Sequence, residues 1–561
     1  MKRLFLFLFV SLIGLAPAFS QFEVDKLNAT LGDEINVTKG KIVTIVGETN
    51  GKIYALANKK DKYFLNVFGS SKMNLISMKE IKMPSTAKKE LNFERVELLD
   101  DKIYLIGSRY IKSKKTYVLN AFSISENGQV KQGAKRLFSV KTEKHSEKGQ
   151  FFFKLSPDKK QIVVMHATIH SKKNQAHYQV RLFDKNLVRI ASKNERVNFA
   201  DRKNAELNIA DFDVNIHGDL FVAVSESYYD KKKKKNFDNF VVFAYKKAKE
   251  YQKEIIKVDL SDNKVLNSSI MANSDNTLNL FGYYAPSKNN GKAKVGLKGV
   301  YAASIDLKDN KVININFNDF DYATKEQIIG KRKAAKDKAL KPFYSIRNII
   351  EKEDGGLLLL SESGMTIYGK TQNALVVAVT PVTYIRNEVI VTSLDRSGKT
   401  EWTRVIPKKQ KASSQTLSVG LAMGAGASNG GVAMTVGASI TIPLAQMGKG
   451  PEYLSFIPFY HNGELLVLFN DNAKNSGVTK VDDAKFMTRF NNSVPTVFKF
   501  DKAGNVKRID TNGVDKNRLV VRPGVYHRKN PGHYIIYASR KSQNKLGRII
   551  LKGSQKGNAT L

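Results

Sequence analysis

Short apolar runs recur along this chain, and polar turn residues bound nearly all of them. In many of the runs apolar and polar residues alternate with a period of two, the pattern of β-strands with one buried face. The runs are too short for typical helices and are bounded by Gly, Asn, Asp and Pro, which punctuate chains of short strands. The predicted strands are 52–57, 63–68, 102–108, 117–124, 161–166, 178–183, 220–225, 239–245, 278–284, 299–307, 357–361, 388–394, 464–469, 496–500, 534–539 and 547–551.

The turns next to these strands carry specific residue pairs. Asn50-Gly51 and Asn462-Gly463 each precede a predicted strand, and Asn-Gly favours tight hairpins because both residues readily adopt positive φ. The most informative turn is the stretch from Asp395 to Gly398, which follows strand 388–394 and leads to Trp402. This stretch is typical of one hairpin in a repeating β-sheet unit.

The strands group into repeated units of about 45–70 residues, the size of a propeller blade with loop insertions. The sequence therefore predicts an all-β protein, a β-propeller-like ring of about seven or eight blades, with an N-terminal strand near residues 35–46 completing the last blade. Two insertions interrupt the pattern, at residues 319–342 and 412–450. The alternative architecture is a pair of stacked all-β domains joined near residues 319–342.

The first insertion contains the clearest helical signal. Residues 324–340 are rich in Lys and Ala and contain no proline, with Gly330 as a weak point. Two hypotheses fit this segment: a helix over the rim between two blades, or a basic helix that binds polyanions or a membrane surface.

The N-terminus predicts export. Lys2 and Arg3 precede an apolar run at residues 4–15, and small residues lead to a predicted cleavage site after Ser20. The apolar run is shorter than the roughly 20 residues that a membrane-spanning helix needs, and no other stretch is a good candidate. The chain contains no cysteine, so its fold depends on the hydrophobic core and not on disulfides.

The charge of the chain is strongly positive: 92 Lys and Arg against 52 Asp and Glu give a formal net charge of +40. Such a charge attracts polyanions. For an exported protein the expected partners are an envelope protein or outer-membrane complex and anionic polysaccharides or lipid headgroups, with nucleic acid the least favoured. The lysines are spread along the chain, and the alternative interpretation is that they solubilise the loops.

The second insertion is unusual because residues 413–448 contain no charged residue. They predict a hairpin with strands 416–423 and 432–442 around a Gly-rich turn at 424–431. An uncharged hairpin requires cover from the protein itself, from a partner or from a bilayer. The residues predicted to contact a partner are Leu417, Val419, Leu421, Met423, Val432, Met434 and Ile440. Burial within the fold and disorder are the alternatives.

The candidate catalytic motifs are weak. Ser428 lies in a Gly-x-Ser-x-Gly match, but no helix signal follows as a nucleophile elbow requires. His166 and His170 share one face of a strand without a third metal ligand nearby. The acidic stretches 318–321 and 470–472 lack the spacing of a calcium loop and are typical of turns. We therefore predict no catalytic residue, no cofactor and no metal site, and we interpret the lysines at 231–235 as a solvated hairpin tip.

Two resemblances extend this interpretation. The stretch from Asp395 to Trp402 is similar to the strand-turn signatures of quinoprotein-type and Asp-box propellers, although here it occurs once and with the only tryptophan of the chain. Four stretches resemble uncharacterised, secreted, propeller-like proteins of Bacteroidota, over roughly residue 319 to the C-terminus: 354–356, 394–398, 406–410 and 469–472. The second resemblance implies an envelope location and no particular reaction.

These observations predict a non-catalytic interaction scaffold of the envelope, a subunit of a periplasmic or outer-membrane-associated complex. The alternative is a hydrolase or binding protein that acts on an anionic envelope glycan. In a hydrolase of this fold the catalytic acids would come from distant blades and leave no local motif.

Overall fold

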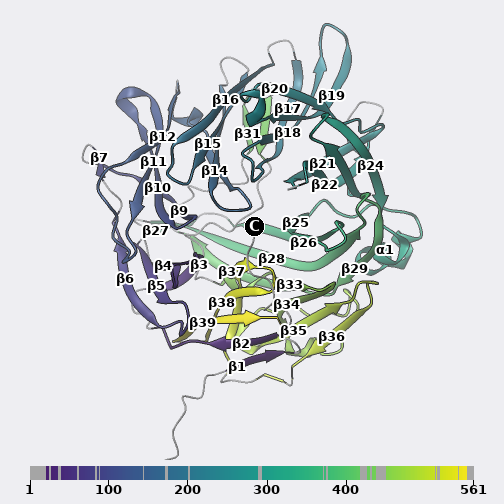
Figure 1. Ribbon diagram of the computed structural model, residues 1–561. Helices are drawn as coiled ribbons and strands as arrows, with labels where there is room; N and C mark the ends of the chain where they lie inside the picture. The colour runs from purple at the N-terminus through teal and green to yellow at the C-terminus, as the bar shows by residue number, and fades with distance from the viewer. Residues whose placement is uncertain are drawn as a thin grey trace, which may run out of the picture.

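The computed structural model describes residues 21–24, 27–35, 40–59, 62–82, 85–86, 89–142, 144–170, 175–199, 202–273, 275–288, 293–369, 372–374, 377–416, 426–429, 432–436, 450–511, 513–514, 518–540 and 542–551. Within these residues the chain is an all-β protein whose strands form the eight blades of a β-propeller, which we label A to H in chain order (Figure 1). The blades follow one another around a ring, so the predicted propeller is confirmed and the alternative of two stacked domains is wrong.

The first four blades each contain a four-stranded antiparallel core. Their strands are β3 Lys41–Thr49, β4 Lys52–Lys59, β5 Lys62–Gly69 and β6 Leu75–Ile81 in blade A; β9 Asn92–Leu99, β10 Lys102–Ile111, β11 Thr116–Ile124 and β12 Lys135–Lys141 in blade B; β13 Gln150–Leu155, β14 Gln161–His170, β15 Gln175–Asp184 and β16 Arg189–Asn198 in blade C; and β17 Arg202–Val214, β18 Leu220–Asp230, β19 Lys235–Tyr245 and β20 Lys253–Lys257 in blade D. A small hairpin of β7 Ser85–Thr86 and β8 Lys89–Glu90 connects blades A and B.

Of the last four blades, E and G follow this plan, whereas F contains six strands and H also includes strands from the N-terminal end. Their strands are β21 Asn263–Ala272, β22 Thr277–Pro286, β23 Gly299–Asp306 and β24 Lys311–Asp319 in blade E; β25 Tyr344–Glu351, β26 Leu357–Tyr368, β27 Gln372–Ala374, β28 Val377–Leu394, β29 Thr400–Ile406 and β30 Gln410–Thr416 in blade F; β33 Ile457–His461, β34 Glu464–Asn472, β35 Ser493–Phe500 and β36 Val506–Asp510 in blade G; and β37 Val520–Asn530, β38 His533–Arg540 and β39 Gln543–Ile550 in blade H.

Blade H closes the ring by combining both ends of the chain. Its strand order is β1-β2-β39-β38-β37, so β1 (Gln21–Val24) and β2 (Leu27–Leu31) form its outer side, where purple and yellow strands meet in Figure 1. Closure by an N-terminal strand is therefore confirmed. The predicted strand, near residues 35–46, is wrong, because residues 41–46 belong to β3, which forms an edge of blade A.

Packing between blades explains why the middle strands were the easiest to predict. Strands such as β4 and β22 are buried along most of their length, whereas the outer strand β6 is largely accessible. Apolar side chains from adjacent blades form shared cores. A middle strand of a propeller is covered on both faces, so its sequence is nearly continuously apolar.

The helical insertion between blades E and F is shorter than predicted. Helix α1 (Tyr322–Ile329) begins where the Asp321 side chain accepts a hydrogen bond from Thr324 N at 2.7 Å, as N-caps do. It ends at Gly330, and α2 covers only Lys331–Ala334. The prediction of helix up to residue 340 is wrong, because Leu340 is fully buried in a backbone bridge to Leu297.

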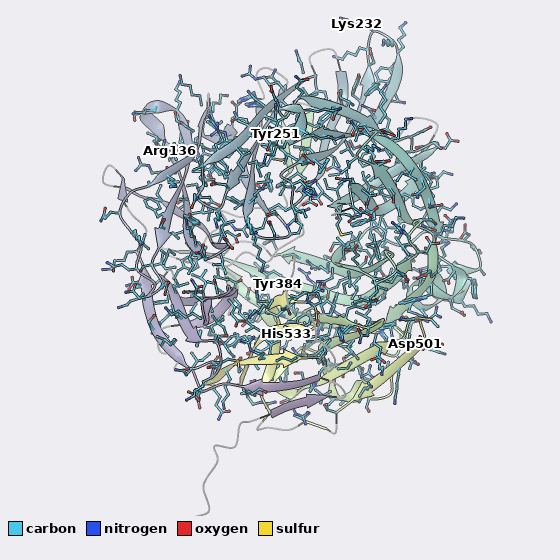
Figure 2. The ribbon with its side chains drawn as sticks, in the orientation of Figure 1. Arg136, Lys232, Tyr251, Tyr384, Asp501 and His533 are labelled. Carbon is cyan, nitrogen blue, oxygen red and sulfur yellow. The ribbon has the colours of Figure 1, made fainter. Side chains whose placement is uncertain are left out.

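Short 3-10 turns occupy several loops: η2 Lys112–Lys114, η3 His145–Glu147, η5 Lys247–Lys249, η7 Pro451–Tyr453, η8 Ala473–Asn475 and η9 Phe490–Asn492. The lysine run at 231–235 spans the tip of the β18–β19 hairpin, and Lys232 projects away from the ring in Figure 2. The Asp230 side chain accepts hydrogen bonds there from Lys232 N and Lys233 N. The predicted hairpin tip is therefore confirmed.

The Gly-rich insertion contributes a hairpin to blade D. Strands β31 (Gly426–Asn429) and β32 (Val432–Val436) pair with each other, and β32 runs parallel to β17, with Ala205 opposite Val432. Figure 1 shows β31, in green, among the teal strands of that blade. Strand β31 lies within residues 424–431, which the sequence predicts as a turn, so the predicted turn is wrong there.

Candidate functional site

The candidate site lies beside blade F, whose strands β26 and β28 continue past the pairing with β25 and β29. Strand β28 pairs with β26 along most of its length, with β29 through residues 389–394 and with β30 through residues 380–386. We call the part formed by residues 364–368, 377–386, β27 and β30 the blade F arm. Its two long strands run across the view below the centre of the ring in Figure 1. The arm carries polypeptide away from the blade core and therefore offers surface that a simple blade does not.

A β-bulge separates the arm from the blade. Glu362 pairs with Val389 and Gly364 pairs with Arg386, so Asn387 and Glu388 together oppose the single residue Ser363. Bulges change the direction in which side chains point and often lie next to binding sites. Here the bulge residues line a cleft of about 410 Å³.

The walls of the cleft come from several parts of the chain. The lining residues are Ile328, Ile329, Gly330, Lys333, Lys341, Phe343, Tyr344, Ser363, Gly364, Met365, Ile385, Asn387, Glu388 and Asp482. They belong to the helices, to the start of β25, to the bulge and to a loop of blade G. The cleft thus combines apolar walls with lysines and with oxygen atoms that can accept hydrogen bonds.

The most buried polar groups of the cleft are Tyr344 and Glu388. The Tyr344 hydroxyl donates a hydrogen bond to the Glu388 carboxylate. Burial, together with the neighbouring Glu388 charge, raises the pKa of Tyr344, so this phenol remains a donor at neutral pH. Asn387 Oδ1 is buried and has no hydrogen-bond partner within the described residues. The cleft therefore presents acceptors that a ligand's N–H or O–H groups could use.

A buried ion cluster holds the base of the arm. The Glu362 carboxylate accepts from Lys408 Nζ at 2.8 Å and from Arg347 Nε at 3.2 Å, and both Glu362 and Lys408 are fully buried. Arg386 Nε lies 3.7 Å from the same carboxylate. Burial by itself would raise the pKa of Glu362, but these three cations hold it below its ordinary value. The cluster joins strands β25, β26 and β28 to the segment leading into β30.

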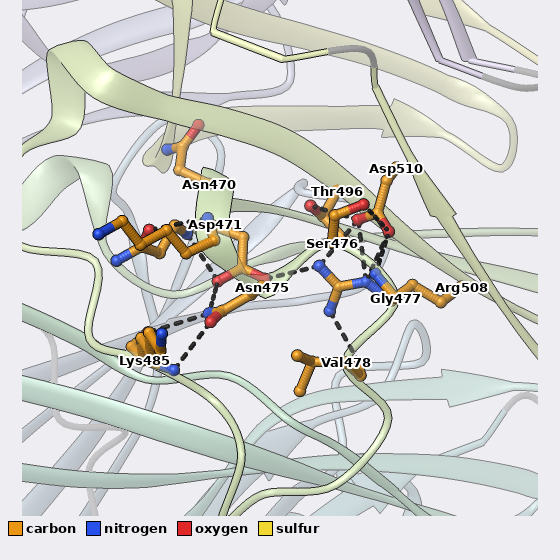
Figure 3. A network of polar contacts seen from close by, with 12 residues as sticks. Asn470, Asp471, Asn475, Ser476, Gly477, Val478, Lys485, Thr496, Arg508 and Asp510 are labelled. Atoms are coloured by element: carbon orange, nitrogen blue, oxygen red, sulfur yellow. Dashed lines mark hydrogen bonds and ion pairs between the residues drawn. The ribbon is translucent and has the colours of Figure 1, made fainter.

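The loop that carries Asp482 into the cleft is fixed by a second network (Figure 3). Arg508 binds the buried Asp471 carboxylate at 2.9 Å and donates to Val478 O at 3.1 Å. Asn475 bonds Asp471 and both backbone groups of Lys485. The loop is therefore clamped at both ends, before and after Asp482. The prediction of a turn at 470–472 is wrong, because these residues end strand β34, where the buried Asp471 has a structural purpose.

The segment from Asp395 to Trp402 contains the turn between β28 and β29 of blade F, and Trp402 contacts blade G. The Asp395 side chain accepts from Lys399 N at 2.9 Å and from Ser397 Oγ at 2.7 Å, so the predicted hairpin is confirmed. Trp402 Nε1 donates to Lys502 O at 3.1 Å, and its ring stacks on Phe500. A Cβ on Gly504 would lie 2.6 Å from the indole, so this close approach requires glycine.

The other predicted site residues lie elsewhere. Val432 and Met434 are in β32, opposite Ala205 and Leu207 of β17. Leu417, Val419, Leu421, Met423 and Ile440 lie outside the described residues. The Gly-rich hairpin as a partner contact therefore stays a prediction.

The structure also places the residues that were weak catalytic and metal candidates. Ser428 lies within strand β31 and not at a strand-to-helix turn. His166 Nε2 bonds Lys148 O at 2.6 Å, and the Asp321 side chain caps α1. Among the described residues no group of three or more His, Asp or Glu side chains is arranged to hold a metal ion. Nor is any helix in that part of the chain long and apolar enough to cross a membrane.

Sequence reasoning missed the cleft and the arm. The arm was hidden because β28 is 18 residues long, and only its last residues were assigned to a strand. The bulge leaves no turn residue to mark it. The length of the apolar and β-branched stretch from residue 377 onward was the one signal that could have revealed the arm.

Comparisons with known proteins return solved structures of low similarity. No family model and no curated protein sequence matches this chain. Among solved structures the chain is similar to the Dos1 propeller, with 8% identity over 93% of this chain and 96% of that chain and a TM-score of 0.38. It is also similar to the WD40 domain of SCAP from fission yeast, with 9% identity, 94% and 95% coverage and a TM-score of 0.34. The third is the polysaccharide lyase Uly1, with 9% identity, 93% and 99% coverage and a TM-score of 0.32.

Proposed function

We propose that this protein is a non-catalytic interaction scaffold of the cell envelope, a subunit of a periplasmic or outer-membrane-associated complex. The observation that carries the proposal is the blade F arm with its exposed apolar side chains. Met365, Ile367 and Tyr368 on β26 are 38%, 45% and 39% exposed, and Phe343 beside them is 44% exposed. Exposed apolar side chains near one another on a sheet are typical of surfaces that bind other proteins.

The envelope part of the proposal rests on the sequence. The N-terminal residues have the pattern of an export signal. Because the chain contains no cysteine, its folding outside the cytoplasm does not depend on disulfide formation. The formal net charge of +40 suits an environment of anionic lipids and polysaccharides.

A second candidate function is binding of an anionic envelope glycan. The observation that favours it is the composition of the cleft, where Lys333 and Lys341 lie around acceptors at Asn387 and Glu388. Lysine side chains can bind the carboxylates or sulfates of such a glycan, and the buried acceptors can accept hydrogen bonds from its hydroxyl groups.

Purification of the native complex tests the proposed function. A tagged full-length protein, expressed in its own cells, is isolated from envelope that has been solubilised in mild detergent, and its mass is measured by light scattering. The proposal predicts a complex of defined stoichiometry that contains at least one other envelope protein. A monomer free of other proteins would contradict it, and co-purification of an acidic polysaccharide alone would support the second candidate.

A further inference from the structure

In the part of the chain that the structure describes, one edge of the blade F arm has no strand beside it. Strand β25 pairs with β26 only as far as Tyr344, which lies opposite Ser363. Beyond that point β26 continues for residues 364–368, and among the described residues only β28 pairs with it there. We call residues 365–368 the open β26 edge. On the far side of the arm the corresponding strand, β30, has a neighbour, because its Lys411 N donates to Met487 O.

The backbone groups of this edge point toward the space that a further strand would occupy. Gly364 N donates to Phe343 O at 2.9 Å, on the β25 side. Backbone groups alternate in direction along a strand, so Thr366 and Tyr368 direct their N–H and C=O groups to that same side. The open edge is thus a template for strand pairing.

The chain beside this edge is strongly basic. Residues 331–341 connect α1 to β25 and are mostly exposed, with six cations against one carboxylate: Lys331, Arg332, Lys333, Lys336, Lys338 and Lys341 against Asp337. The Asp337 carboxylate is already bound by Lys325 Nζ at 2.6 Å. Lys333, Lys341 and Met365 line the same cleft, so the basic segment and the open edge face one another. Asp482 and Glu388 are the two carboxylates in that lining.

We propose that an extended, acidic segment of a partner protein adds to the open β26 edge as an extra strand. Its backbone would pair with Thr366 and Tyr368, and its acidic side chains would lie against the basic segment 331–341. This inference rests on the proposed scaffold function and specifies the partner surface. Strand addition takes its affinity from main-chain hydrogen bonds and its specificity from side-chain contacts, and here the charges select an acidic strand.

A proline substitution at the open β26 edge tests whether the partner binds by strand addition or by charge attraction alone. Proline is tolerated on an edge strand where its missing N–H would face solvent, so Thr366→Pro removes one edge donor and leaves the pairing of β26 with β28. Thr366→Ala keeps the donor and serves as the matched control. Lys333→Glu combined with Lys341→Glu tests the charge.

The probe is a blocked, fluorescent peptide of alternating Glu and Val, roughly ten residues long, as strands commonly are. Fluorescence anisotropy with the full mature chain measures its affinity. We expect Thr366→Pro and the double Lys→Glu variant to weaken binding at least about tenfold and Thr366→Ala to change it less than about twofold. The same peptide with N-methyl groups on alternate residues, tested on the unaltered protein, should bind at least about tenfold more weakly as well.

Equal affinity for Thr366→Pro and Thr366→Ala, or for the methylated and plain peptides, would overturn the inference. So would an oligogalacturonate that displaces the peptide and binds Thr366→Pro as well as the parent, because the surface would then belong to an anionic saccharide. Purification of the native complex from the Thr366→Pro strain distinguishes the two proposals. An intact complex means that the scaffold function stands and this edge is wrong, whereas absence of a complex in the parent strain rejects the scaffold function itself.

Discussion

At the scale of single residues, the ion cluster around Glu362 is the most consequential interaction beside the cleft. Glu362→Gln removes the carboxylate that binds Lys408, and it leaves Arg386 and Arg347 without this counter-charge. Removing one partner from a buried pair costs about 3–5 kcal/mol. We expect urea unfolding to show a loss of that order.

The matched control for this prediction is an exposed pair. Glu126 binds Lys52 at 2.6 Å on the surface of blades A and B, and pairs of that kind contribute little to stability. Glu126→Gln should therefore leave the urea midpoint nearly unchanged. If Glu362→Gln behaves in the same way, the cluster does not stabilise the base of the arm.

His166 predicts a specific pH dependence of stability. Burial, with smaller effects from His177, His170 and Arg181, lowers the pKa of His166 to about 4, although the hydrogen bond to Lys148 O opposes the shift. Its pKa in the unfolded chain is about 6.5, so only the unfolded chain binds a proton between these values. Stability is therefore fully present above pH 6.5 and falls as the pH drops toward 4.

The variant His166→Gln tests this contribution because the glutamine amide can still donate to Lys148 O. Urea unfolding at several pH values between 7 and 4 should show that the stability of the variant falls less steeply with pH than that of the parent. The difference in slope should reach up to about 1.4 kcal/mol per pH unit, which corresponds to one proton. Identical slopes for variant and parent would show that His166 does not control this loss. His527, whose burial also lowers its pKa to about 4, remains in both proteins.

Sequence reasoning at this scale found turns but not buried charges. Asn50-Gly51 and Asp395 were identified because turn chemistry depends on adjacent residues. The pairing of Glu362 with Lys408 connects positions 46 residues apart, and a single sequence contains no signal for such a contact. Buried ion pairs of this kind form only once the topology brings their strands together.

At the scale of elements, the loop between β34 and β35 is expected to depend on its polar clamp. Asn475 is fully buried and bonds both backbone groups of Lys485. Asn475→Ala leaves these groups without their partners, at a cost of about 1–3 kcal/mol. Hydrogen exchange followed by mass spectrometry should show faster exchange over residues 476–486, with the open β26 edge unchanged. Unaltered exchange in that loop would contradict the assigned clamp.

The predicted elements were most accurate where burial is two-sided. The predicted strands 161–166, 178–183 and 534–539 lie within β14, β15 and β38 because middle strands are continuously apolar. The predicted helix 324–340 is wrong beyond Ala334, since composition favours helix there while the buried Leu340 favours a bridge to Leu297. Tertiary packing overrides helix propensity in that segment.

At the scale of the whole molecule, ring closure by β2 is expected to control stability. Ala29 is fully buried in blade H, and its neighbour Thr30 is exposed. Ala29→Glu buries an unpaired charge in the closing blade, at a cost of at least about 3 kcal/mol, whereas Thr30→Glu places the charge in water. Calorimetry should show a lower melting temperature for Ala29→Glu than for the parent, and a nearly unchanged one for Thr30→Glu. Equal melting temperatures would contradict closure through β2.

The ring was predictable from the sequence, and the surface that distinguishes this propeller was not. Repeated strand and turn units determine a propeller because each blade obeys the same local rules. The cleft combines residues from α1, β26, β28 and a loop of blade G, which lie up to 154 positions apart (482 − 328 = 154). Only the assembled blades bring these residues together.

Site-specific photo-crosslinking in living cells tests the central claim most directly. A photoreactive residue replaces Ile367 on the open β26 edge or, as the control, Ile313, which is 58% exposed on β24 of blade E. We expect one discrete adduct with an envelope protein from position 367. This adduct should be lost in Thr366→Pro and retained in Thr366→Ala. No adduct should form from position 313. No adduct at position 367, or the same adducts from both positions, would contradict it.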